Sequence, residues 1–143
     1  MFQVFQTPLK TQQGVMILVR RNYFDHFQKI YQDLHSQFTI AIRFIKNLPD
    51  DKQIDIIVIG HYSQQTEQER ATDELRFFSE NIQRDYPGVR LVVMGDFNRH
   101  PDSTRSLTQS VNLSISEPTI QNGFYTYKRG VTQSWIDFIA SDG

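Results

Sequence analysis

The sequence predicts a single domain of the α/β class that spans residues 1–143. Two apolar runs, 54–60 and 91–94, have the length and the branched side chains of buried strands. Between them, residues 66–84 place apolar side chains at three- and four-residue steps, the pattern of an amphipathic helix. A strand, a crossover helix and a second strand are typical of α/β domains, although in a mixed sheet the two strands need not be neighbours.

Composition narrows the class of protein. Aromatic residues make up 13% of the 143 residues, which indicates a folded globule and not a disordered chain. The sequence has no cysteine, so we expect neither disulfides nor thiolate zinc sites, and an intracellular location is the default. No apolar run predicts a secretory signal or a membrane span. Because the net charge is −1, any phosphate binding must come from local basic groups.

Three strands are predicted in the first half of the chain. Residues 14–21 form an apolar run that ends in two arginines and favours a strand. Residues 37–44 alternate apolar and polar side chains, which predicts a half-buried strand. The run 54–60 is apolar at nearly every position, which predicts a central strand, and it brings His61 and Tyr62 to its carboxyl end.

The second half begins with the predicted helix, 66–84, which ends before the breaker sequence 86–88. Its apolar stripe consists of Ala71, Leu75, Phe78 and Ile82. Residues 101–113 have room for one short helix. Residues 124–127 and 135–139 are then predicted to be two strands that could pair as a hairpin with a long turn.

Two polar residues follow the run 91–94 almost at once. Gly95 releases the backbone, and Asp96 and Asn98 come next. In an open sheet, ligands bind at the carboxyl ends of the central strands, and two residues at this spacing point the same way if the backbone stays extended. Asp and Asn are also ordinary turn formers, and the spacing alone favours a turn.

The tetrapeptide Gly95-Asp96-Phe97-Asn98 after two valines and a methionine resembles the central motif of the endonuclease/exonuclease/phosphatase superfamily, which includes DNase-I-like nucleases. The resemblance implies a partial two-sheet α/β sandwich of mixed strands with outer helices. It also implies that Asp96 engages the attacking water. Asp96 would be the one protein ligand for magnesium that remains, because the metal-binding glutamate of the family is not found in this sequence. Asn98 would hold the scissile phosphate or Asp96 itself.

The same resemblance gives roles to residues on other strands. Abasic-type members place a tyrosine, and DNase-I-like members a histidine, at the end of the first central strand; the alignment favours Tyr62, with His61 second. Their side chains should point to opposite faces of the sheet. The segment 134–137 resembles a later motif in which an aspartate, here Asp137, orients a catalytic histidine. The alternative for Asp137 is a solvent-facing carboxylate on an ordinary strand.

Four further residues are expected to contact substrate. Thr126 and Ser134 match the order of motifs in the endonuclease domains of non-LTR retrotransposons, in which a threonine-aromatic strand precedes Ser-x-Ile-Asp. Lys128 and Arg129 lie between the strands that flank the proposed site and could meet a nucleic-acid backbone, although solvation explains either one alone.

The resemblance therefore implies a magnesium-dependent endonuclease domain, retroelement-derived, that nicks DNA through its phosphate backbone with weak sequence preference. Such domains also carry an early metal-binding glutamate and a late Ser-Asp-His segment, and neither is found in this sequence. We therefore expect a truncated domain with weak metal binding and impaired activity. Two alternatives remain open: a phosphatase acting on small phosphoesters or phosphoinositides, and a non-catalytic remnant that binds a partner.

Overall fold

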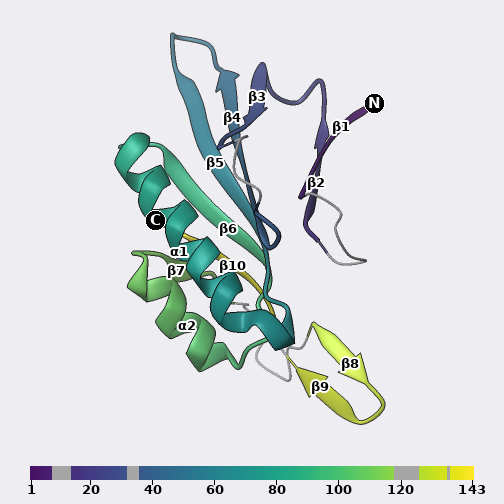
Figure 1. Cartoon of the computed structure of the whole chain (residues 1–143). Helices are drawn as coiled ribbons and strands as arrows, with labels where there is room; N and C mark the ends of the chain where they lie inside the picture. Colours follow the sequence, from purple (N-terminus) through teal and green to yellow (C-terminus); the bar gives the residue numbers. More distant parts are fainter. Residues whose placement is uncertain (8–13, 32–35, 118–125, 135) are drawn as a thin grey trace.

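Six strands form a mixed sheet at the centre of the structure, a computed structural model that describes residues 1–7, 14–31, 36–117, 126–134 and 136–143 (Figure 1). Only β5 and β6 run parallel; the other neighbouring pairs of this sheet are antiparallel. In spatial order the strands are β3 (His26–Lys29), β4 (Thr39–Asn47), β5 (Gln53–Tyr62), β6 (Arg90–Asp96), β10 (Asp137–Ser141) and β7 (Ser114–Ile115).

The central sheet carries a different layer on each face. Helices cover one face, and a two-stranded antiparallel sheet lies against part of the other (Figure 1). The helices are α1 (Gln68–Asp85), preceded by the short η1 (Gln65–Glu67), and α2 (Pro101–Ser110); the second sheet consists of β1 (Phe2–Gln6) and β2 (Met16–Arg20). This arrangement is the partial two-sheet α/β sandwich that the sequence predicts. No helix in the described part of the chain combines the length and apolar content needed to cross a lipid bilayer.

The α1 helix forms where the apolar stripe predicts it. The four stripe residues are each at most 4% exposed and pack on the central sheet: Ala71, Leu75, Phe78 and Ile82. Burial of each large side chain contributes about 1.5–3 kcal/mol. The helix ends at Asp85, and the N–H of Tyr86 closes its last turn by donating to Ile82 O at 2.8 Å. The prediction for this helix is confirmed.

The segment β5–α1–β6 is a strand–helix–strand crossover unit, and its two strands are direct neighbours in the sheet. Ile57 pairs with Leu91 and Ile59 pairs with Val93, and all four side chains are at most 1% exposed. Parallel pairing requires the crossover that α1 supplies. It also places the carboxyl ends of β5 and β6 at the same edge of the sheet.

Strand β4 is buried on both faces, so the prediction of a half-buried strand is wrong. Ile40 and Ile42 are fully buried against β2, while Ala41 between them is fully buried on the helix side. The alternation along β4 indicates which residues share a face of the sheet. Whether the second face is exposed to water depends on whether another layer packs on it.

The opposite error concerns the two apolar runs, which we predicted to be covered on both faces. Leu91 and Val93 are buried, yet Met94 is 40% exposed and Ile54 is 43% exposed. The sheet β1–β2 packs over β4 and β5 and leaves β6 and β10 open on that side, where Ile139 is also 50% exposed. Part of the central sheet is therefore covered on its helix face alone.

The predicted hairpin between 124–127 and 135–139 is also wrong. The hairpin that forms joins β8 (Tyr127–Arg129) to β9 (Thr132–Ser134) through a two-residue turn with Gly130 at φ 60°. Tight hairpins favour a glycine in this left-handed region. Strand β10 instead pairs with β6, because its inward residues join the main core. Residues 124, 125 and 135 lie outside the described part.

Candidate active site

Three strand ends meet at one edge of the central sheet. Tyr62 at the end of β5 is the register partner of Asp96 at the end of β6, and Asp96 is in turn the partner of Asp137 at the start of β10. Register partners on neighbouring strands project to the same face of a sheet. The structure therefore brings together Tyr62, Asp96 and Asp137, three of the residues that the sequence singles out.

Gly95 lets β5 and β6 approach closely just before Asp96. Its φ angle is 154°, and a Cβ atom at this position would lie 1.8 Å from the carbonyl oxygen of His61. Only glycine fits such a contact. Beyond it, the N–H of Ser63 donates to Asp96 O at 2.8 Å, so the backbones stay joined where the carboxylate emerges.

Asp96 and Asn98 form the turn that their residue types allow. The N–H of Asn98 donates to Oδ1 of Asp96 at 2.9 Å, and Asn98 has a φ of 46°. The side-chain amide of Asn98 donates to the carbonyl oxygen of Ser63 at 2.8 Å. The turn and the site are thus compatible: the turn engages one carboxylate oxygen of Asp96 and fixes its direction.

The carboxylates at this edge influence each other. Burial raises the pKa of Asp96, the N–H of Asn98 acts against that rise, and the charge of Asp137 adds to it. A raised pKa means that negative charge is poorly compensated here. The pair of carboxylates therefore favours a cation beside it.

Asp137 is exposed at the start of β10, and Thr126 holds this strand start in place. The hydroxyl oxygen of Thr126 accepts hydrogen bonds from the N–H groups of Ile136 and Asp137, each at 3.1 Å. Thr126 thus fixes the backbone beside Asp137, and its contact with substrate stays a prediction. Ser134 ends β9 and pairs with Tyr127 of β8.

His61 lies beneath the site on the helix side of the sheet. It is 2% exposed, its ring centroid is 5.1 Å from that of Phe97, and Nδ1 is 3.0 Å from the hydroxyl of Thr39. Burial, with a contribution from the charge of Arg99, lowers the pKa of His61 to about 3. Tyr62, which is partly exposed, shares the face of Asp96, whereas His61 is a neutral buried group at physiological pH.

Solved structures share this arrangement of strands and helices. No protein-family model and no curated protein matches the sequence. Truncated TDP2 from Caenorhabditis elegans matches with a TM-score of 0.65 and 12% identity, over 99% of this chain and 62% of that one. An endonuclease/exonuclease/phosphatase family protein from Bacteroides thetaiotaomicron matches with a TM-score of 0.59 and 15% identity, over 99% and 60%. TDP2 from D. rerio, complexed with a single-strand DNA product, matches with a TM-score of 0.53 and 13% identity, over 98% and 61%.

The chain has the DNase-I-like fold. At these identities the likeness concerns the fold alone, and the chain spans about 60% of the length of the three structures. Within this fold, the strand order puts Asp96 and Asp137 on neighbouring strands at the edge described above.

Gln68 and Arg99, which the sequence analysis does not single out, hold the loop that carries Asp96 and Asn98 in this DNase-I-like chain. The side-chain amide of Gln68 donates to Asn98 O at 2.8 Å. Arg99 donates through Nη2 to Gln68 O at 3.3 Å and to the hydroxyl of Thr72. No local pattern could reveal these contacts, because the partners lie about thirty residues apart in the chain.

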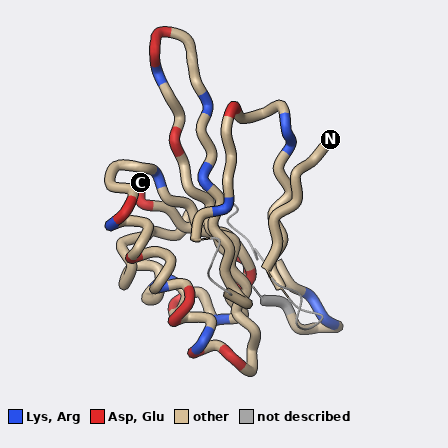
Figure 2. The backbone as a smooth tube through the Cα atoms, turned by 45° about the horizontal axis from the view of Figure 1, so that its top comes forward, with Lys and Arg blue, Asp and Glu red and all other residues tan. Residues whose placement is uncertain are grey.

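Basic residues are available at the same end of the molecule. Lys128 and Arg129 are exposed on the β8–β9 hairpin, which lies at the end where β5 and β6 terminate (Figure 1). Elsewhere in the described part of the chain, acidic and basic positions are interspersed along the backbone (Figure 2). This distribution fits local phosphate contacts better than a long-range attraction for nucleic acid.

The donor set for a metal ion is sparse. Within the described residues, no group of three or more His, Cys, Asp or Glu side chains could hold a metal ion. Asp96 and Asp137 supply carboxylate oxygens, the ligand type that magnesium prefers, and magnesium keeps several waters in most sites. The described residues thus offer magnesium ligands of the right chemical type but show no complete metal site.

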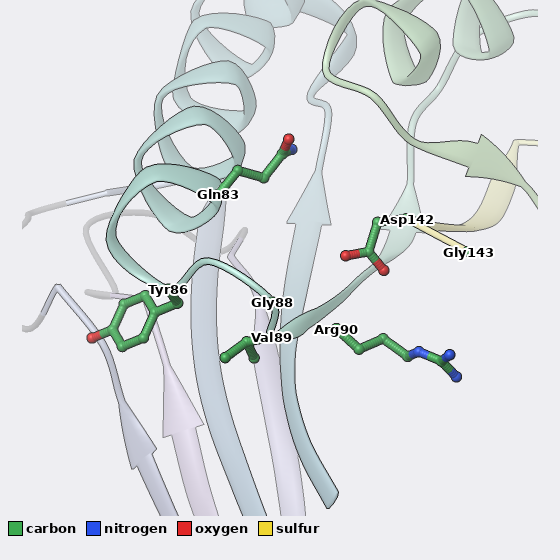
Figure 3. Close-up of a pocket in the computed structure, with 7 residues that line it drawn as sticks. All are labelled: Gln83, Tyr86, Gly88, Val89, Arg90, Asp142 and Gly143. Carbon is green, nitrogen blue, oxygen red and sulfur yellow. The ribbon is translucent and has the colours of Figure 1, made fainter.

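A pocket of the structure lies away from this edge (Figure 3). It is lined by Gln83, Tyr86, Gly88, Val89, Arg90, Asp142 and Gly143. Arg90 and Asp96 are the two ends of β6, so about 20 Å of strand separates the pocket from the carboxylates. The pocket and the candidate site are separate features.

Proposed function

We propose that this chain is a phosphodiesterase domain of the endonuclease type that nicks DNA with the help of a weakly bound magnesium ion. The observation that carries the proposal is the meeting of Tyr62, Asp96 and Asp137 at one edge of a DNase-I-like fold. The single-strand DNA product in the D. rerio TDP2 structure supports a nucleic-acid substrate for this fold.

The proposal assigns a different role to each residue at this edge of the sheet. Asp96, fixed by the N–H of Asn98, orients the attacking water, and Tyr62 on the same face donates its hydroxyl to a phosphate oxygen. Asp137, whose charge already acts on Asp96, stands where the resemblance places the carboxylate that orients a histidine; in this chain the leaving oxygen would take its proton from water. A magnesium ion, when bound at Asp96, would supply neutralising charge for the phosphate.

Substrate contact is proposed to run through the sugar-phosphate backbone. Lys128 and Arg129 are exposed at the same end as the carboxylates and offer the local cations that a chain with a net charge of −1 needs to bind phosphate. Contacts of this kind position a nucleic acid without reading its sequence. The contacts of Thr126 and Ser134 with substrate, which the resemblance to retrotransposon endonuclease domains implies, are also part of the proposal.

A plasmid-nicking assay with magnesium tests the proposal. We expect slow nicking that Asp96→Asn reduces at least about 100-fold, since such groups contribute roughly 10²–10⁴-fold. Asp51→Asn is the matched control, because Asp51 is an exposed carboxylate in the turn before β5, at the opposite end of that strand from Tyr62. Equal nicking by the wild type and Asp96→Asn would contradict the proposal.

The same preparation separates the two alternatives. Turnover of phosphoinositides without nicking of plasmid DNA would assign a phosphatase. Binding of an oligonucleotide without cleavage in magnesium or manganese would assign a non-catalytic domain.

A further inference from the structure

The loop that carries Asp96 and Asn98 is fastened to the start of α1 by two side chains. Gln68, the first residue of α1, donates through Nε2 to Asn98 O at 2.8 Å. In the reverse direction, Arg99 donates through Nη2 to Gln68 O at 3.3 Å and to the hydroxyl of Thr72, one turn further along the helix. These bonds, here called the Gln68–Arg99 contact, tie the loop and the helix together in both directions.

The conformation of Asn98 shows why such a contact is needed. Its φ of 46° lies in the left-handed region, which costs a residue other than glycine about 1–2 kcal/mol, although Asn tolerates it better than most. A residue stays in that region when its surroundings over-determine it. Asn98 is bonded through its N–H to Asp96, through its side-chain amide to Ser63 O, and through its carbonyl oxygen to Gln68.

Arg99 is held in an unusual way for a charged side chain. It is only partly exposed, and the acceptors that the structure gives it are neutral oxygens, those of Gln68 and Thr72. Its Nε is buried and has no acceptor among the described residues. Moving a guanidinium out of water onto neutral acceptors costs solvation energy, so stability alone does not account for the arrangement. Its geometric effect is to fix where α1 begins relative to Asn98.

We propose that Gln68 and Arg99 are positioning residues that keep Asn98 in its left-handed conformation, so that the N–H of Asn98 holds the carboxylate of Asp96 in one direction. The proposal concerns the geometry of the loop and goes beyond the proposed function. Only its consequence for the catalytic rate rests on the proposed function. Without the contact, the loop could relax to a right-handed turn, and the bond between Asn98 and Asp96 would open more often.

Amide hydrogen exchange measured by NMR tests this on the folded chain without any activity. Gln68→Ala should speed exchange of the Asn98 N–H about fivefold, the factor expected for the loss of one hydrogen bond. Gln83→Ala is the matched control, because Gln83 on the last turns of α1 makes the same kind of bond, from Nε2 to Val111 O at 2.8 Å. We expect it to leave exchange at Asn98 unchanged.

A second variant separates positioning from general loosening. Arg99→Met keeps the length of the side chain but has no N–H to donate to Gln68 O and to the hydroxyl of Thr72, so it should also speed exchange at Asn98 while leaving exchange in the middle of α1 unchanged. Unaltered exchange at Asn98 in both variants, or an equal effect of Gln83→Ala, would overturn the proposal. If the chain nicks DNA, Gln68→Ala should lower kcat more than it raises KM. A chain that nicks nothing leaves the exchange result intact, so the two proposals fail separately.

Discussion

His61 should make the folded chain sensitive to mild acid. The imidazole is 2% exposed, packs on Phe97, and has the hydroxyl of Thr39 as a hydrogen-bonding partner. Its Nε2 has no partner among the described residues. Protonation would bury an uncompensated charge, and this is why the pKa of His61 falls from 6.5 to about 3.

The size of the effect follows from linkage. The unfolded chain takes up a proton as the pH falls through 6.5, while the folded chain keeps His61 neutral until about pH 3. The stabilisation is therefore complete above pH 6.5 and is lost as the pH falls toward 3. Between pH 7 and pH 5 the loss amounts to about 2 kcal/mol. At pH 5 the value depends almost entirely on the unfolded pKa, because the folded group is still neutral.

Urea unfolding followed by circular dichroism at pH 7 and pH 5 measures this loss. The matched variant is His61→Gln, which is polar and does not titrate. The wild type should lose about 2 kcal/mol more than His61→Gln between the two pH values, a shift of roughly 1 M in the urea midpoint. Equal losses in the two proteins would refute the assignment of His61 as a buried neutral group.

Three further predictions concern stability and are checked by the same unfolding measurement at pH 7. Gly95→Ala should destabilise by on the order of 3 kcal/mol or more, because its Cβ would meet a backbone carbonyl of β5; Gly88→Ala, with open space around it, should cost only about 1–2 kcal/mol. Leu75→Ala should cost about 2–5 kcal/mol because Leu75 is fully buried, and Phe77→Ala, at 45% exposure, clearly less. Asp96→Asn should stabilise the chain at pH 7, because the raised pKa of Asp96 penalises its charged form in the folded state; the gain should disappear below the ordinary pKa of 3.8.

The elements that the sequence predicts correctly are those whose pattern is local. The stripe of α1 has a helical period, and the period identifies the buried face whatever that face contacts. The runs of β5 and β6 are predicted for a similar reason, and the helix between them makes parallel neighbours the simplest outcome. The predicted end of the second strand, at Met94, lies two residues before the observed end at Asp96.

The errors arise where a distant segment decides the outcome. Burial of Ile40 and exposure of Met94 both depend on how far β1–β2 extends across the sheet, which neither strand encodes. The pairing of β10 with β6, in place of a hairpin near Tyr127, depends on which apolar surface offers the larger core. Periodicity contains no information on either choice.

The candidate site also contains residues that the sequence predicts and contacts that it does not. Asp96 and Asn98 are found from the residue types that follow a strand, and the register that aligns Asp96 with Tyr62 and Asp137 follows once the strand order is known. The Gln68–Arg99 contact could not be predicted, because polar residues at a helix start are common and nothing local indicates their partner.

The open face of the sheet connects packing to chemistry at the site. Met94 and Ile139 lie two residues from Asp96 and Asp137 on the same face, and they are register partners of each other. The two carboxylates therefore stand at the end of an apolar strip that is in contact with water. A layer laid over this strip would remove water beside the carboxylates, and their repulsion would grow because the local dielectric constant falls. The pKa of Asp96, already raised by burial and by Asp137, would rise further, and the demand for a cation would increase with it. Coverage of Met94 and Ile139 would thus strengthen the magnesium binding that the proposed function assigns to Asp96, without a change of ligand.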